Sequence, residues 1–598
     1  MKKVISFIVA ILIFLDFSLF ALPIGGTALI KLSDDFYSEM DLLYLSLGRM
    51  VSKTRPYSAN EANVYLKAIE NVPMRESERK IYKKLRAQVA LIDNEDDEQV
   101  YHLSTRGVIN PEFYFHTNTK FRDDIEYDEK GKPKEEYCKS YSPFYNEFLN
   151  AVRQKSFMTI GFDIMVKSNA ALHFEFPIAN SVHTLKPFGS TNFGNNLPLV
   201  SSFTSFDYED FNCNFPYRAF MSIGNEWWNM VIGREQYDFG SGISGNFLID
   251  EHLPYHNALN LTAFSPNFKM SFLASFFPHP SQYEDVDAPV DPNKIKLKRY
   301  FDQNEDAYTG IKLLLDHRLE WINKEATFRV ALDEAIIYQN DKGVLDLQIF
   351  NPVMLFHNLY VAGNANSILT LEWDYMLKKG VEQKIALVID DLNIPGEKKH
   401  AIEQGNEPKP DAIGLQLGFE TATPLSNGFL KSALEVTLTS SALYLRDSNN
   451  EKNPYTLNYI VAIRNQRSNH GIYDLTYIGY PYGSNALNCL FSIGYLSVDN
   501  WAFDTELVFN IKGPVNLNSR YSIKDGDGYK YPFMKLKEDP LNAYQLSLRS
   551  TTSGYYCITK DFDVISSFTF YNVWNMNNDP SSPFEFDFEL KVGCKYTF

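Results

Sequence analysis

The last fifteen residues of the chain alternate between hydrophobic and polar side chains. Every second position from Phe584 to Phe598 is apolar, and the positions between them carry charged or polar residues and one glycine. Successive side chains of a β-strand point to opposite faces, so one face of this stretch is wholly apolar. The pattern predicts a strand that is either half-buried in a soluble β protein or exposed to lipid in a membrane barrel.

The same alternation recurs along most of the chain. It is clearest in residues 172–176, 369–377, 413–419, 434–438 and 544–548. With their flanks these segments reach about ten residues, the length of a tilted strand that crosses a bilayer. Residues 100–598 accommodate about 16–18 strands of this kind with their loops. We therefore expect an all-β transmembrane barrel of antiparallel strands over residues 100–598.

The N-terminal part of the chain has a different pattern. A basic start and a long apolar run predict that residues 1–21 are a secretory signal peptide. In residues 28–95 the apolar positions follow the helical period of 3.6, with a helix that ends at Gly48, a capping box at Ser58–Glu61 and a third helix from Glu76. We expect a small α-helical bundle here, on the periplasmic side of a bacterial outer membrane.

Composition favours the membrane barrel over the soluble alternative. Hydrophobic residues make up 44% of the chain, yet the mean hydropathy is -0.27, and no apolar run after the N-terminal one is long enough for a membrane helix. Only a closed barrel can satisfy its backbone groups in lipid with short alternating strands. Aromatic residues make up 15% of the chain, which fits the aromatic girdles of such barrels.

Charge and motif content exclude several function classes. The net charge of -17 argues against a nucleic-acid partner, because phosphate binding needs a basic surface. The five cysteines are scattered and lack the spacing of a metal site, so we expect no metal, no other cofactor and no disulfide framework. No nucleophile or metalloprotease motif is present, and we expect no enzymatic activity.

One glycine-rich stretch matches a nucleotide-binding motif by sequence alone. Residues 240–245 match the dinucleotide pattern G-x-G-x-x-G, but no helical pattern follows them as that fold requires. A bend or a close backbone approach inside the barrel is the better interpretation.

Several motifs resemble the Wzi capsule-assembly family. They are residues 231–242 with 245–249, the pair His317-Arg318, residues 331–338 and the pair Asn351-Pro352. The helical start, with a helix that ends at Gly48, agrees as well. The resemblance implies a barrel of about 18 strands with a helical bundle at its periplasmic end. It also implies a lectin-like role in attaching or organising surface polysaccharide.

The resemblance and the residue chemistry together give a set of candidate glycan or lumen residues. Arg234, beside Tyr237 and Asp238, could hold sugar hydroxyls through forked hydrogen bonds, or could brace the lumen by pairing with a carboxylate. Trp228 is a candidate for the aromatic girdle or for a ligand contact. His317, Arg318 and Glu334 are expected to line the lumen.

The expected partners follow from this hypothesis. They are surface polysaccharide, outer-membrane lipid, and the barrel-assembly machinery, which reads C-terminal strands that end in phenylalanine, as this one does at Phe598. We expect a monomer. The alternative function is an outer-membrane porin or solute channel, which would need a continuous polar bore.

Overall fold

The computed structural model describes most of the predicted barrel and the helical segment. The described residues are 25–90, 101–117, 158–166, 169–180, 199–201, 211–212, 218–278, 283–285, 294–297, 310–340, 344–351, 365–392, 396, 399–400, 403–404, 411–446, 457–464, 472–515, 517, 523–525, 528–530 and 544–598. The predicted signal peptide lies outside these residues, as do large parts of the longer connections.

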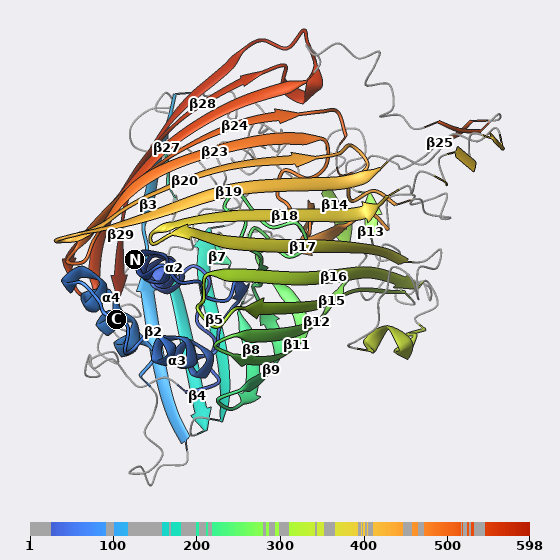
Figure 1. Ribbon diagram of the computed structural model, residues 1–598. Helices are drawn as coiled ribbons and strands as arrows, with labels where there is room; N and C mark the ends of the chain where they lie inside the picture. The colour runs from blue at the N-terminus through green and yellow to red at the C-terminus, as the bar shows by residue number, and fades with distance from the viewer. Residues whose placement is uncertain are drawn as a thin grey trace.

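The strands form a closed antiparallel barrel of eighteen strands, which confirms the predicted fold class (Figure 1). The barrel strands and the short strands paired to them are β2 (Tyr101–Ile109), β3 (Glu112–His116), β4 (Met158–Val166), β5 (Ala170–Asn180), β6 (Leu199–Ser201), β7 (Phe211–Asn212), β8 (Ala219–Gly224), β9 (Trp228–Glu235), β11 (His256–Ser265), β12 (Phe268–Phe277), β15 (Ile311–Ile322), β16 (Phe328–Asn340), β17 (Ala365–Lys378), β18 (Val381–Asp391), β19 (Ala412–Leu425), β20 (Gly428–Thr439), β23 (Ala486–Ser497), β24 (Trp501–Lys512), β27 (Gln545–Thr559), β28 (Phe562–Trp574) and β29 (Glu585–Thr597). The barrel closes where β29 pairs with β2.

Smaller elements form sheets and turns separate from the barrel wall. Strands β1 (Thr54–Arg55) and β10 (Asp238–Phe239) form a two-stranded sheet of their own. A four-stranded sheet contains β13 (Tyr283–Asp285), β14 (Lys294–Leu297), β22 (Ile472–Tyr477) and β21 (Ile460–Arg464), and β25 (Ile523–Asp525) pairs with β26 (Gly528–Lys530). Two short 3-10 helices are η6 (Leu347–Phe350) and η9 (Met576–Asn578).

The two faces of the barrel wall carry opposite chemistry, as the alternation predicts. On β19, Leu415 and Leu417 are 48% and 39% exposed on the outer face, whereas Gln416 between them is buried on the lumen face. On β29, Phe586 and Val592 are exposed and Asp587 is buried. Large apolar side chains are stable on the outside of a barrel because lipid surrounds them there.

Tight turns gather at one end of the barrel, which we call the turn end; the opposite end is the loop end. The turn between β17 and β18 uses Gly380 with φ of 79°, a backbone conformation that favours glycine. Exposed aromatic residues lie near the turn end, among them Trp321, Tyr375 and Tyr556. They form the aromatic girdle expected where lipid meets water.

Three helices confirm the predicted helical segment and pack at the turn end (Figure 1). They are α2 (Asp35–Leu47), α3 (Ala59–Ala68) and α4 (Glu76–Gln88). Helix α2 ends at Gly48 with φ of 74°, and the Ser58 side chain caps α3 by accepting a hydrogen bond from the backbone of Glu61. Their common core packs against three residues of the barrel turns, namely Met376, Ala422 and Phe429. No helix among the described residues is long and apolar enough to cross a membrane.

Candidate functional site: the closed lumen

The loop between β9 and β11, residues 236–255, leaves the barrel wall and crosses the lumen; we call it the plug loop. At its tip, the backbone N–H groups of Ile243 and Ser244 donate to the Glu435 carboxylate on β20, over 2.7 and 2.8 Å. Gln416 on β19 donates to the carbonyl of Gly245 over 3.0 Å. Because the loop leaves the wall at β9, returns to it at β11 and contacts β19 and β20 with its tip, it joins distant parts of the wall.

The glycine-rich stretch forms the tip of this plug loop. Gly240 and Gly245 have φ of 144° and 131°, and a Cβ on Gly245 would lie only 2.4 Å from the ring of Pro481. The match to the dinucleotide pattern therefore reflects a tight bend in the lumen, as the sequence interpretation proposed.

A hydrophobic layer packs against the plug loop inside the barrel. The plug loop and parts of the connection between β20 and β23 bury aromatic side chains against one another. The rings of Tyr444 and Tyr459 stack with centroids 5.5 Å apart, and their hydroxyls donate to the carbonyls of Phe247 and Leu248 over 2.6 and 3.2 Å. His252 of the plug loop lies 2.8 Å from the carbonyl of Tyr477. These contacts fix the loop with both packing and hydrogen bonds.

A layer of buried charge lies on the wall of β15, β16 and β17. The Arg318 guanidinium donates to Asp333 at 2.9 Å and forks onto Glu372 at 2.9 and 2.8 Å. Arg329 donates to Glu372 at 2.8 Å and to Asp374 at 2.7 Å. Both arginines are at most 1% exposed. Such a network is stable only when every charge is paired, because removing one partner leaves another charge buried alone.

The N-terminal segment joins this charged layer to the plug loop. Thr54 accepts a hydrogen bond from Arg318 at 2.8 Å, and the backbone of Lys53 donates to Glu320 at 3.1 Å. On its other side, β1 pairs with β10 of the plug loop, with Arg55 opposite Asp238. Three chain segments distant in sequence therefore meet in the lumen.

Burial has an electrostatic consequence at Asp238. Desolvation by burial, together with the nearby Glu251 and Asp250 carboxylates, raises the pKa of Asp238 well above its usual range, although Arg55 opposes the shift. The Asn246 side chain donates to Asp238 over 2.6 Å, which holds the carboxyl inside the bend. The role of Asp238 in this structure is to organise the plug loop.

The structure separates the predicted site residues into two groups. Tyr237, Asp238 and Arg318 lie in the lumen, where Tyr237 and Arg318 are almost fully buried. Arg234 does not pair with Asp238. It donates to Asn257 over 2.8 Å and stacks on Tyr255, with 4.3 Å between the guanidinium and the ring centroid. Arg234 shares strand parity with the exposed Ile232 and lies on the outer face, so of its two interpretations the lumen brace is wrong.

The lumen placement of His317 and Glu334 is also wrong. They oppose each other across β15 and β16 and face outward, since the alternating neighbour Arg318 faces the lumen. They are shielded because η6 and its flank pack over this outer face, with Ile349 buried beside Phe272 and Leu315. The sequence could not show this cover, because it comes from a connecting segment.

Trp228, for which the sequence left a girdle position and a ligand contact open, lies next to Trp227 on the outside of the barrel. Trp227 lies in the turn before β9 and is 62% exposed, and Trp228 faces outward on the same side as Ile232. Their rings are 6.1 Å apart. Both tryptophans therefore belong to the girdle, which was the simpler of the two interpretations.

Four residues of the charged layer and of the plug-loop contact were not predicted: Arg329, Glu372, Asp374 and Glu435. The signal that could have found them is a charged residue at consecutive inward positions of a predicted strand, as with Glu372 and Asp374 between Leu371 and Tyr375. A charge repeated on the lumen face needs a buried partner, here on the neighbouring strands β15 and β16.

Another part of the lumen wall keeps charged side chains partly exposed. On β20, β24 and β27, Lys431 pairs with Asp504 at 2.8 Å and Arg549 pairs with Glu506 at 2.7 Å. These four side chains are between 29% and 41% exposed. Such a surface can hydrogen-bond a polar solute. Among the described residues, no group of three His, Cys, Asp or Glu side chains is placed to hold a metal ion.

Comparison with known proteins identifies the fold. No protein-family model and no curated protein matches the chain. The solved structure of Wzi from Escherichia coli, described as a carbohydrate-binding β-barrel outer-membrane protein involved in group 1 capsule assembly, matches with a TM-score of 0.53. The match covers 96% of this chain and 99% of that chain at 11% identity, and it shows a shared fold.

Two outer-membrane proteins of other kinds match less well. The channel DcaP of Acinetobacter baumannii matches with a TM-score of 0.30 and 7% identity over 84% of this chain and 99% of that chain. OprD of Pseudomonas aeruginosa matches with a TM-score of 0.35 and 7% identity over 83% of this chain and 95% of that chain.

Proposed function

We propose that this protein is an outer-membrane anchor that binds or organises surface polysaccharide without catalysing a reaction. The observation that carries the proposal is the plug loop, whose tip is held by Glu435 across the lumen. A loop fixed in this way, with a buried hydrophobic layer above it, fits an anchor better than a conduit. The fold shared with Wzi, a carbohydrate-binding barrel, gives the proposed ligand class.

The finer features of this proposal follow from the same family hypothesis. The chain is a distant member of the Wzi capsule-assembly family, acts as a monomer, and has its helices in the periplasm and its loop end toward the outside. The barrel-assembly machinery reads its C-terminal strand, which ends on Phe598. The glycan contacts lie at the loop end and use polar and aromatic side chains, which hydrogen-bond hydroxyls and stack on sugar rings.

A transport channel is the alternative function. It is favoured by the partly exposed charges of Lys431, Asp504, Glu506 and Arg549, which could line a bore beside the plug. In that case the plug loop would only narrow the lumen.

Two measurements on the same purified protein distinguish the anchor from the channel. The purified protein is tested for ion conductance in planar bilayers and for saturable binding to surface polysaccharide. The anchor hypothesis expects sugar binding with no steady conductance, whereas Glu435→Ala, which releases the plug-loop tip, should conduct. Steady conductance of the unaltered protein without sugar binding would overturn the anchor hypothesis and support the channel.

A further inference from the structure

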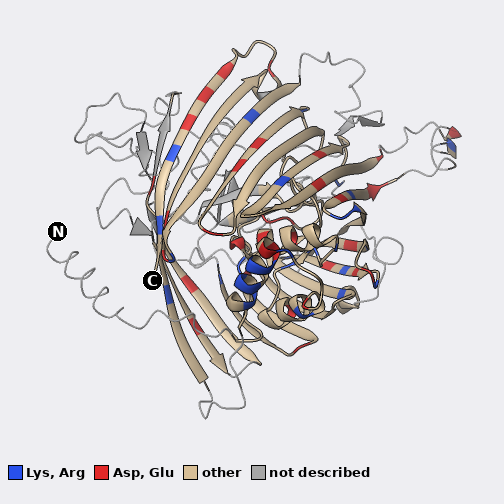
Figure 2. Ribbon diagram, turned by 60° about the vertical axis from the view of Figure 1, so that its left-hand side comes forward, with Lys and Arg blue, Asp and Glu red and all other residues tan. Residues whose placement is uncertain are grey.

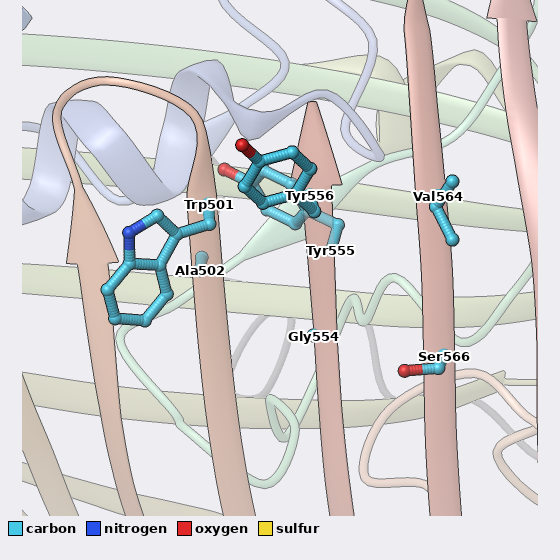
Figure 3. A pocket seen from close by; sticks show the side chains of 7 residues that line it. All are labelled: Trp501, Ala502, Gly554, Tyr555, Tyr556, Val564 and Ser566. Carbon is cyan, nitrogen blue, oxygen red and sulfur yellow. The ribbon is translucent and has the colours of Figure 1, made fainter. Parts of the chain in front are cut away.

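The lipid-facing wall has a shallow groove near the turn end. It lies on β24, β27 and β28, has a volume of about 450 Å³ and is shown in Figure 3; its lining residues are Trp501, Ala502, Gly554, Tyr555, Tyr556, Val564 and Ser566. Trp501, Tyr556 and Val564 are 38%, 52% and 37% exposed, which places this groove on the outer surface. Gly554 and Ser566 are register partners, and their small size leaves the space between the larger side chains.

The groove continues toward the middle of the wall as a strip of small hydroxyl side chains. Thr505 and Thr552 are register partners on β24 and β27 and share a hydrogen bond of 3.0 Å. Large apolar residues surround the strip, including Phe503, Leu507 and Phe568, each about 40% exposed. A hydrocarbon chain can therefore approach the strand backbone here more closely than elsewhere on the surrounding wall, as small residues allow in membranes.

A basic helix lies at the rim beside this groove. Residues 75–88, which cap and form α4, contain six basic and two acidic residues in a protein with a net charge of -17 (Figure 2). Lys80 lies 3.4 Å from Asp499 in the turn before β24, and Asp499 is two residues from Trp501, or roughly 7 Å of chain. The basic helix is therefore next to the groove.

The positive charge of this helix is not cancelled by its neighbours. Lys80 pairs with Asp499, and Lys84 pairs with Glu39 of α2. Arg79 and Lys83, four residues apart on the same side of α4, are exposed. Clustered basic residues at a membrane surface attract anionic lipid headgroups.

We propose that the groove and the exposed side of α4 together bind one anionic glycerophospholipid. One acyl chain lies in the groove between Trp501 and Val564, and the phosphate contacts the basic side of α4. Trp501 and Tyr556 mark the depth at which a headgroup meets water, since aromatic residues favour that boundary. This site is independent of polysaccharide binding at the loop end.

Lipid retention measured by native mass spectrometry tests the site. The full-length protein, purified in detergent, is titrated with phosphatidylglycerol, which is anionic, and with phosphatidylethanolamine, which has no net charge. We expect preferential binding of one phosphatidylglycerol. Ser566→Leu, which fills the groove, should reduce binding of both lipids severalfold. Arg79→Glu with Lys83→Glu should reduce phosphatidylglycerol binding by about fivefold for each basic residue removed, and leave phosphatidylethanolamine binding unchanged.

Two matched controls make the outcome decisive. Ser432→Leu adds the same bulk on the outer face of β20, and Lys67→Glu reverses a charge on α3; neither should change lipid binding. Thermal unfolding of each variant confirms that it is folded. Equal binding of the two lipids by the unaltered protein, or equal retention by Ser566→Leu and Ser432→Leu, would overturn the proposal.

Discussion

At the scale of single residues, Arg318 is the most consequential buried charge. It binds Asp333, Glu372 and Thr54 at once and is 1% exposed. We expect Arg318→Met to destabilise the barrel by about 3–5 kcal/mol, because the carboxylates would remain buried without their cation. Lys399→Met removes an exposed ion pair with Glu403 and should cost at most about 0.5 kcal/mol.

Thermal unfolding in detergent, followed by the mobility shift of heated and unheated samples on electrophoresis, measures both variants. If Arg318→Met unfolds at the same temperature as Lys399→Met, the buried network does not contribute to stability.

Strand parity explains which site residues the sequence could place. Alternation shows that His317 and Arg318 face opposite sides, but the residues themselves do not say which side is the lumen. Leu319 and Trp321, exposed on the side of His317, carry that information, because lipid-facing positions are apolar. Arg234 and Glu334 were misplaced for the same reason, since a charge was assumed to face inward.

At the scale of elements, the plug loop should be separable from the barrel wall. Glu435 holds the loop tip through two backbone N–H groups and the Ser244 hydroxyl, the last at 2.5 Å. We expect Glu435→Ala to leave the barrel folded and to expose residues 236–255 to protease, because the tip loses its three hydrogen bonds to Glu435. Limited proteolysis with mass spectrometry of the fragments measures this, with Glu506→Ala on the partly exposed wall as the control.

A plug loop as resistant to protease in Glu435→Ala as in Glu506→Ala would contradict this account. The hydrophobic layer and the remaining hydrogen bonds would then be sufficient to hold the loop.

Docking of the helical segment should weaken in acid through Asp41 of α2. Burial alone would raise the pKa of Asp41, but attraction by Arg55, Lys53 and Lys384 outweighs it and lowers the pKa below its usual range. A carboxyl with a depressed pKa stabilises the folded state above its unfolded pKa of about 3.9, and this stabilisation is lost as the pH falls below that value. We expect faster proteolysis of residues 25–90 at about pH 3 than at pH 7.

The pH dependence of proteolysis must also be measured for Asp41→Asn. Protonation of two other carboxyl groups strengthens docking of the helical segment, whereas protonation of Asp41 weakens it. Burial raises the pKa of Glu39 and Glu61 despite their pairing with Lys84 and Lys269, so protonation of these two groups favours docking. Asp41→Asn should be loosened already at pH 7 and should not loosen further in acid. An unchanged acid response in Asp41→Asn would assign the effect to other groups.

The helices and strands could be predicted because their signals are local. Gly48 and Ser58 mark helix ends through their own backbone and side-chain chemistry, and the period of two marks each strand. The plug loop could not be predicted as a plug, since its position depends on Glu435, almost two hundred residues away. Only the glycine-rich bend at its tip was visible in the sequence.

At the scale of the whole molecule, the barrel depends on a single seam between its first and last strands. Gly107 and Phe598 exchange backbone hydrogen bonds of 2.8 and 2.9 Å across this seam. The Phe598 ring lies over Gly107, where a Cβ would come within 2.2 Å of it. The terminal phenylalanine therefore closes the barrel as well as ending the strand.

Gly107→Val should displace the Phe598 ring and weaken closure, because the valine side chain would occupy the position of the ring. We expect a lower unfolding temperature for the refolded protein, with a cost of about 1–3 kcal/mol typical of overpacking. Gly396→Ala, at a glycine with open space around it, is the matched control. The double variant Gly107→Val with Phe598→Ala removes the clash and should be less destabilised than the sum of the two single variants. Additive costs in the double variant would mean that Phe598 contributes to closure without packing on Gly107.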